Sequence, residues 1–189
     1  MKKLFIVAML LGNLSSFSQQ KHTRQINLIP ELTGLNGSEA AGISYAMSGI
    51  VFNNGWGWGI GAGVDYYKMR SVPVFFCGRK EFGKADHHLF GYGQFGYNVA
   101  APLDNQYPHG GYGRSDFSNG VYCDLGIGYA SLNTRRRGFE VSIGYSVKTL
   151  KESYTDYIYR DFPPYGIEES PHSFSYRFNR LALKIGIRL

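Results

Sequence analysis

The segment GWGWGIGAGVDYY, residues Gly55 to Tyr67, decides the fold class. Its glycines fit either a phosphate-binding loop or a β-strand with glycine at every second position. A dinucleotide-binding loop has its glycines at the start of a helix, and a P-loop ends in Gly-Lys-Ser/Thr, and this segment has neither feature. Apolar and small residues instead alternate without interruption: Trp56, Trp58, Ile60, Ala62, Val64 and Tyr66 against Gly57, Gly59, Gly61, Gly63 and Asp65. A period of two predicts a strand.

The same alternation recurs from residue 25 to the end of the chain, most clearly in RLALKIGIRL at 180–189 and in GFEVSIGYSVK at 138–148. It predicts eight strands, at about 25–35, 38–52, 55–68, 72–82, 87–99, 119–132, 138–152 and 175–189. Counted along the chain, the second, fourth and sixth gaps are all short, whereas the odd-numbered gaps include both long ones. This predicts an all-β fold, an eight-stranded antiparallel up-and-down transmembrane β-barrel, with both chain ends on the short-turn side.

The first residues are typical of a secretory signal peptide. Lys2 and Lys3 precede the apolar stretch LFIVAMLLGNL, and Ser16 and Ser18 are the small residues before an expected cleavage. We expect residues 1–18 to be removed and 19–189 to form one barrel domain. Loss of two lysines and no acid lowers the formal charge from +6 to +4. A modest, dispersed positive charge suits an anionic lipid surface and does not indicate a nucleic-acid partner.

The two faces of the strands decide the environment of the barrel. One face carries glycine, alanine and serine with isolated charges, which a narrow lumen can hold. The other carries bulky aromatic residues near strand ends, as at a membrane interface: Trp56, Trp58, Tyr66, Phe95, Tyr97 and Tyr145. A soluble lipocalin-like barrel in the periplasm, with its apolar face turned inward around an apolar ligand, is the alternative. The pattern favours the membrane.

The chain resembles the small Gram-negative outer-membrane β-barrels of the OmpX and OmpA-transmembrane-domain type, the outer membrane protein beta-barrel domain family. The resemblance rests on strand pattern over the whole mature chain. It implies contact with outer-membrane lipid and insertion by the barrel-assembly machinery, guided by the last strand. Lys184, Gly186 and the terminal Leu189 match that insertion signal in part, with Leu in place of the more usual Phe.

An eight-stranded barrel is just wide enough to be filled by its own side chains. The polar face therefore predicts a structural charge network in the lumen rather than a diffusion pore, because buried charges need partners. Its members are Glu31, Asp65, Arg79, Glu81, Asp124, Glu140, Lys148, Arg180 and Lys184.

The two long gaps, at 101–120 and 153–172, are predicted as extracellular loops that carry the binding candidates. These are Tyr107, Tyr112, Phe117, Tyr157, Tyr159, Phe162 and Tyr165. Adhesion to an extracellular protein or a glycan would suit them, and packing over the barrel mouth would suit them equally. The sequence does not decide between the two.

An enzyme acting on lipid A acyl chains is a further alternative, because His172 lies near Ser173, Ser175, Glu168 and Glu169. Neighbouring strand residues point to opposite faces, so neither serine is placed for activation by His172. We therefore predict no catalytic site.

The remaining clusters predict no metal and no cofactor. Asp86, His87 and His88 are expected in a solvated turn, as are the three arginines at 135–137. Cys77 and Cys123 fall on strands that are not neighbours, with Cys77 inward and Cys123 outward. They are therefore expected to be free thiols.

Overall fold

The structure, a computed structural model, describes residues 26–38, 40–83, 86–103, 115–160 and 166–189. Within these ranges the side chains at 115, 157–160 and 166–168 are not described. The chain runs through the strands β1 (Ile26–Gly37), β2 (Ala41–Asn53), β3 (Trp56–Asp65), β4 (Ser71–Phe82), β5 (His87–Ala100), β6 (Ser115–Ser118), β7 (Gly120–Leu132), β8 (Gly138–Arg160) and β9 (Gly166–Arg188). In the described part of the chain, no helix is both long enough and apolar enough to cross a membrane.

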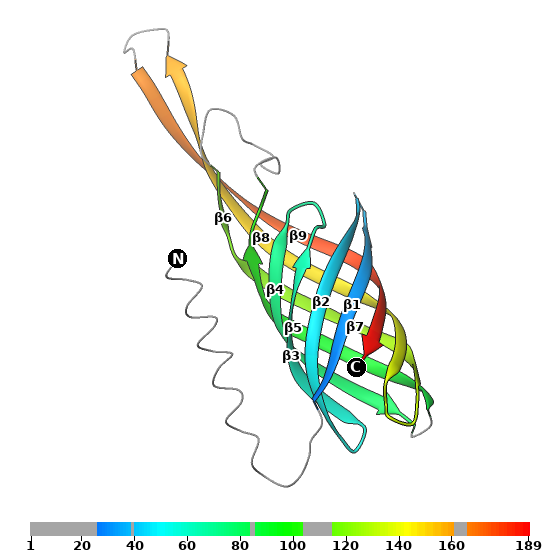
Figure 1. The fold of residues 1–189 in the computed structure, drawn as a ribbon. Coiled ribbons are helices and arrows are strands. Elements are labelled where there is room, and N and C mark those ends of the chain that lie inside the picture. The colour runs from blue at the N-terminus through cyan, green and yellow to red at the C-terminus, as the bar shows by residue number, and fades with distance from the viewer. Residues whose placement is uncertain (1–25, 39, 84–85, 104–114, 161–165) are drawn as a thin grey trace, which may run out of the picture.

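Eight of these strands close into a ring, which confirms the predicted fold class. Each pairs antiparallel with its neighbours in the order β1, β2, β3, β4, β5, β7, β8, β9, and β9 pairs back onto β1 through Glu31↔Gly186 to Gly37↔Arg180 (Figure 1). The short strand β6 pairs only with β8, at the outer end of the ring. Closure removes the exposed sheet edges from the wall of the barrel.

β6 and β7 form one strand with a bulge between them. Ser118 pairs with Lys151 and Tyr122 pairs with Lys148, so four steps along β6 and β7 match three along β8. One residue is therefore extra, which is the definition of a β-bulge. The side chain of Asn119 turns to β5, where its Oδ1 accepts a hydrogen bond from the Ala100 N–H at 2.9 Å.

Short turns gather at the end of the barrel that holds the C-terminus. β2 and β3 are joined by Asn54 and Gly55, with φ of 50° and 76°, the positive values that a two-residue type I′ hairpin requires. β7 and β8 are joined by 133–137, where Asn133 Oδ1 accepts the N–H groups of Arg135 and Arg137 at 3.0 Å. We expect this end to face the periplasm, because outer-membrane barrels have their short turns there.

The last two strands are much longer than the sequence predicts. β8 and β9 were expected to end near 152 and to begin near 175, but they pair continuously from Gly138↔Arg188 to Arg160↔Gly166. The predicted second loop is therefore largely a β-ribbon, and this prediction was wrong. The polar and Pro-rich composition of this segment is compatible with a ribbon. The pairing of β9 with β1 ends at Arg180, so β9 is an edge strand at Pro171. An edge strand tolerates a residue without an N–H group.

The outer surface of the ring is apolar. Ile60, Ile127 and Phe139 are each about two-thirds exposed, and large apolar residues occupy the outward positions of all eight strands. Aromatic residues form a girdle at each end: Tyr45, Tyr66, Tyr97 and Tyr145 toward the ribbon, and Trp56, Trp58, Phe82, Tyr129 and Phe139 toward the turns. An apolar band between two aromatic girdles matches a bilayer. The alternative of a soluble barrel with an inward apolar face does not hold.

The glycines of the segment at 55–67 face the lumen and make room for their neighbours. A Cβ at Gly61 would lie 2.5 Å from the Phe75 ring, and one at Gly57 would lie 2.8 Å from Ile50 Cγ2. Ile50 and Phe75 lean across the space over β3 and pack with Ile29, Cys77 and Tyr122 into an apolar cluster inside the barrel. The glycines therefore serve internal packing.

Candidate functional site

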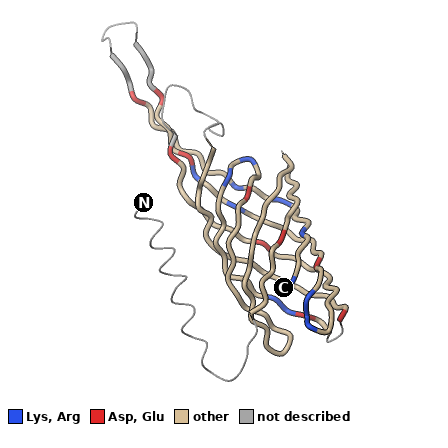
Figure 2. Tube along the Cα trace, in the orientation of Figure 1, with Lys and Arg blue, Asp and Glu red and all other residues tan. Residues whose placement is uncertain are grey.

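All nine residues predicted for the lumen lie on the inner face of the wall. Eight of them are buried, and the ninth, Glu31, is largely buried at its side chain. Acidic and basic positions are interspersed along the barrel strands (Figure 2). They form an outer group near the ribbon, a middle group, and an inner group near the turns.

The outer group has Asp65 at its centre. Asp65 accepts hydrogen bonds from Arg180 and, at 3.0 Å, from Lys148 Nζ. The same Lys148 ammonium donates to the carbonyl oxygens of Tyr67 at 2.9 Å and Met69 at 2.8 Å. The connection at 66–70 therefore folds into the barrel mouth, where Tyr67 is 2% and Met69 6% exposed. This short connection closes the outer end of the lumen.

The middle group joins Lys184 to Asp124. Lys184 Nζ lies 3.1 Å from Asp124 Oδ2 and 3.9 Å from Glu31 Oε2. The hydroxyl of Tyr92 donates to Asp124 Oδ1 at 2.9 Å, and Lys184 Nζ also donates to Gln94 Oε1 at 3.1 Å. Each charged group here has an opposite charge within ion-pair distance, as burial requires.

The inner group links two arginines through two glutamates. Arg188 donates to Glu140 Oε1 at 2.8 Å and to Glu81 Oε1 at 2.7 Å. Arg79 donates to the other oxygen of Glu140, and its guanidinium lies 3.4 Å from the centre of the Phe90 ring. The C-terminal strand is thereby fastened to β4 and β8 from inside the barrel.

The ten charges of these three groups balance. Arg79, Lys148, Arg180, Lys184 and Arg188 supply five positive charges, and Glu31, Asp65, Glu81, Asp124 and Glu140 supply five negative ones. Arg188, Lys148 and Arg180 are at most 1% exposed. Solvent therefore hardly reaches these three side chains.

Sequence reasoning missed several contributors at the turn end. Arg188 lies on the polar face of the last strand but was not assigned to the network. The solvated-turn prediction was wrong for His88, which is buried in β5 with Nε2 3.4 Å from Glu81 Oε1. It was also incomplete for Arg136, which donates to Glu81 Oε2 at 2.6 Å. The predicted strand boundaries were uncertain by a residue, so the sequence did not show which side chains near the turns point inward.

Beyond the ring, β8 and β9 continue as a two-stranded ribbon, which projects well past the other strands (Figure 1). We call the part at 151–160 and 166–178 the ribbon. The outward face of β8 and β9 becomes polar at Lys151, Arg177 and Asn179, which marks the edge of the apolar band. β6 pairs with its base at 151–154 and widens it to three strands there.

The face of the ribbon that continues the lumen side carries a row of aromatic rings. Tyr154 stacks on His172 at 5.2 Å and on Phe174 at 5.7 Å, and Tyr176 stacks on Phe178 at 6.0 Å. Phe174 is 39% exposed. Burial of the Tyr176 hydroxyl and its hydrogen bond to Glu152 raise its pKa to about 12. We call these five residues the aromatic row.

The loop candidates named from the sequence fall largely outside this surface. Phe117 is partly buried in β6. Tyr157 and Tyr159 lie in β8, but their side chains are outside the described set. The remaining four, Tyr107, Tyr112, Phe162 and Tyr165, lie outside the described residues. Sequence reasoning missed the aromatic row because it treated 153–172 as a loop, and strand alternation at Phe174, Tyr176 and Phe178 could have indicated it.

The residues weighed for catalysis do not come together. His172 stacks on Tyr154 and lies 3.7 Å from Asp156 Oδ2, whereas Ser173 and Ser175 occupy alternate positions of β9 and so face the other side. Glu169 is exposed, and the side chain of Glu168 is outside the described set.

No cluster of three His, Cys, Asp or Glu side chains suited to a metal ion occurs among the described residues. Cys77 is buried on the lumen side, Cys123 lies on the outer face, and both are free thiols.

The three residues matched to an insertion signal lie in the last part of β9 and, for Leu189, just past its end. Lys184 belongs to the middle charge group, and Gly186 faces inward opposite Glu31. Leu189 is exposed, and its N–H donates to the carbonyl of Leu28 at 2.9 Å.

A closed antiparallel ring with an apolar outer band and a charged, buried interior defines a transmembrane β-barrel. The fold and this outer surface together place the chain among the eight-stranded outer-membrane β-barrels.

Comparison with one solved structure agrees with this fold. The chain is similar to the outer membrane protein OprG from Pseudomonas aeruginosa, with a TM-score of 0.56 and 9% identity, over 89% of this chain and 97% of that chain. Neisserial surface protein A matches 87% of this chain and 96% of its own, with a TM-score of 0.45 and 14% identity. The sequence matches no protein-family model and no curated protein.

Proposed function

We propose that this protein is a non-enzymatic outer-membrane barrel that closes its own lumen and displays the ribbon as a binding surface outside the cell. The observation that carries this proposal is the continuous pairing of β8 and β9 well beyond the ring, with the aromatic row on one face.

The lumen supports a structural role in this proposal. Five acids and five bases pair inside a ring with an apolar cluster, and Lys148 holds the connection at 66–70 within the mouth. A diffusion pore needs an open aqueous path, which eight-stranded barrels rarely have room for. The charge groups therefore hold opposite walls of the barrel together.

The ribbon supports a binding role because its shape is fixed before any partner arrives. Two paired strands lose little conformational freedom on binding, which favours affinity. Tyrosine and histidine supply flat contact area with few rotatable bonds, together with hydrogen-bonding groups. An extracellular protein or glycan is the proposed partner. Tyr107, Tyr112, Phe117, Tyr157, Tyr159, Phe162 and Tyr165 are proposed to add to this surface.

Export and insertion complete the proposal. Residues 1–18 act as the signal peptide and 19–189 form the barrel domain. Lys184, Gly186 and Leu189 present the last strand to the barrel-assembly machinery. Outer-membrane lipid is the permanent partner of the apolar band, and no cofactor is required.

Removing three of the five residues of the aromatic row is expected to weaken binding more than about tenfold, because buried aromatic anchors dominate interfaces. The variant combines Tyr154→Ala, His172→Ala and Phe174→Ala. The protein is reconstituted in nanodiscs and screened on arrays of immobilised glycans and extracellular matrix proteins.

The matched control combines Ser153→Ala, Ser173→Ala and Ser175→Ala on the opposite face of the same ribbon. It should retain wild-type binding. Loss of binding in the control, retained binding in the aromatic variant, or no binding by the wild-type protein would each contradict the proposed role of the aromatic row.

A further inference from the structure

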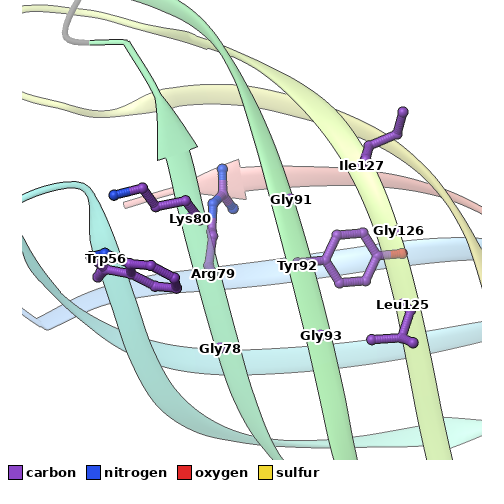
Figure 3. A pocket seen from close by; sticks show the side chains of 10 residues that line it. All are labelled: Trp56, Gly78, Arg79, Lys80, Gly91, Tyr92, Gly93, Leu125, Gly126 and Ile127. Atoms are coloured by element: carbon purple, nitrogen blue, oxygen red, sulfur yellow. The ribbon is translucent and has the colours of Figure 1, made fainter.

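The outer face of the barrel has a depression near the turn end. It has a volume of about 520 Å³ and lies over β3, β4, β5 and β7. Paired outward residues line it in two rows: Trp56, Lys80, Gly91 and Ile127 in one, and Gly78, Gly93 and Leu125 in the other, with Arg79, Tyr92 and Gly126 between the rows. Figure 3 shows Trp56 and Lys80 on one side, Leu125 and Ile127 on the other, and the three glycines between them.

Gly91 is the open part of the depression, because a Cβ at Gly78 would lie 2.9 Å from Trp58 Cζ3 and one at Gly93 would lie 3.0 Å from Leu125 Cδ2. Bulky residues bound it. Phe76 and Phe95 stand on the side toward the membrane interior, and Phe82 and Leu89 on the side toward the turns, all exposed on the outer face. A Cβ at Gly91 would meet only ordinary contacts, with Phe82 Cε2 at 3.7 Å. The trough is therefore open enough at Gly91 to admit an apolar chain from outside.

A single positive charge lies at the edge of this trough. Among the described residues the Lys80 ammonium forms no ion pair, and it lies 4.6 Å from the centre of the Trp56 ring. Lys80 is two residues from the end of β4, within the girdle of Trp56 and Phe82. A lysine there keeps its stem in the apolar layer and its ammonium at the level of lipid phosphates.

We propose that this trough is a binding site for one anionic phospholipid of the periplasmic leaflet. One acyl chain lies over Gly91, between Trp56 and Ile127, and Lys80, oriented by Trp56, pairs with the phosphate. Basic pockets on membrane proteins recognise anionic headgroups in this way. The proposal rests on the membrane-embedded barrel and is independent of what the ribbon binds.

A second copy of the chain fits this face less well. A two-fold contact through the trough is self-complementary, so it would bring the Lys80 of each copy toward the other. Like charges in such a contact are unfavourable, whereas a phosphate supplies the missing opposite charge. The positive charge of Lys80 therefore favours an anionic lipid over a second copy of the chain.

The test is native mass spectrometry of the refolded full-length protein in detergent, titrated with palmitoyl-oleoyl phosphatidylglycerol and, separately, with the phosphatidylcholine of the same chains. We expect the wild-type protein to prefer phosphatidylglycerol. Lys80→Met should weaken that binding about fivefold, the contribution of one lysine near an anionic surface. Gly91→Leu, which fills the trough, should weaken binding of both lipids.

Gly49→Leu is the matched control. Gly49 is also an outward glycine with only ordinary contacts, the nearest being Ile26 Cγ2 at 3.6 Å, but it lies on β2 outside the trough. It should bind phosphatidylglycerol as the wild-type protein does. Equal affinity for the two lipids, or unchanged binding in Lys80→Met, would overturn the proposal, as would a dimer that Gly91→Leu abolishes. Should Gly91→Leu not refold, Lys80→Met decides alone.

Discussion

Replacing Asp65 by Asn is expected to lower the free energy of unfolding of the barrel by about 3–5 kcal/mol, the usual cost of breaking a buried ion pair from one side. Asp65 is 1% exposed and accepts hydrogen bonds from both Lys148 and Arg180. Asparagine keeps the shape but leaves two buried cations without their counter-charge. Urea unfolding of the refolded protein in lipid vesicles, followed by tryptophan fluorescence, measures the change.

Two comparisons separate this effect from a general loss of stability. The double variant Asp65→Asn with Lys148→Met removes one of the stranded cations, so it should be less destabilised than the two single changes added together, by about 0.5–3 kcal/mol. Asp156→Asn changes an acid on the ribbon that is about half exposed and should shift stability by less than about 0.5 kcal/mol. If the loss of stability in the double variant equals the sum of the losses in Asp65→Asn and Lys148→Met, the buried pairing of Asp65 is contradicted.

Replacing Gly59 by Ala is expected to destabilise the barrel by about 3 kcal/mol, the upper end of the usual cost of overpacking. A Cβ at Gly59 would lie 2.0 Å from the carbonyl oxygen of Gly49. That atom is backbone in the neighbouring strand, so it cannot rotate away, and β2 must shift to admit the methyl group. The same urea unfolding experiment measures the loss.

Gly34→Ala is the control for this substitution. Gly34 also lies within a strand, but a Cβ there would meet its nearest atom, the Leu183 carbonyl oxygen, at 3.9 Å. Its stability should stay within about 0.5 kcal/mol of the wild-type value. If the two alanine variants unfold at the same urea concentration, the close approach of β2 and β3 at Gly59 is not present.

The fold could be predicted from the sequence because strand alternation has a period of two. Once Trp56 and Trp58 are assigned outward, Asp65 on the same strand must face inward. Residues paired across neighbouring strands face the same way, so the assignment extends around the ring. The same parity indicated the inward direction of Arg79, Lys148 and Arg180. The number of ring strands follows from counting turns, which are short at one end of the barrel.

The contacts between groups could not be predicted in this way. Lys148 reaches the carbonyl of Tyr67, 81 residues earlier in the chain, only because the barrel closes. Periodicity specifies which face a residue occupies but not its position along the barrel axis. The separation into three charge groups could therefore not be predicted. The ribbon was missed because Pro171 and the acids around it resemble loop residues, whereas cross-strand pairing decides the outcome.

The most direct measurement of the central claim is the gel mobility of the membrane fraction, boiled and unboiled, after washes with high salt and with carbonate. The apolar outer band and the closed ring predict that the protein resists both washes, and that its compact unboiled form migrates differently from the boiled chain. A protein that washes into the soluble fraction, with one mobility before and after boiling, would contradict a barrel whose apolar face meets lipid.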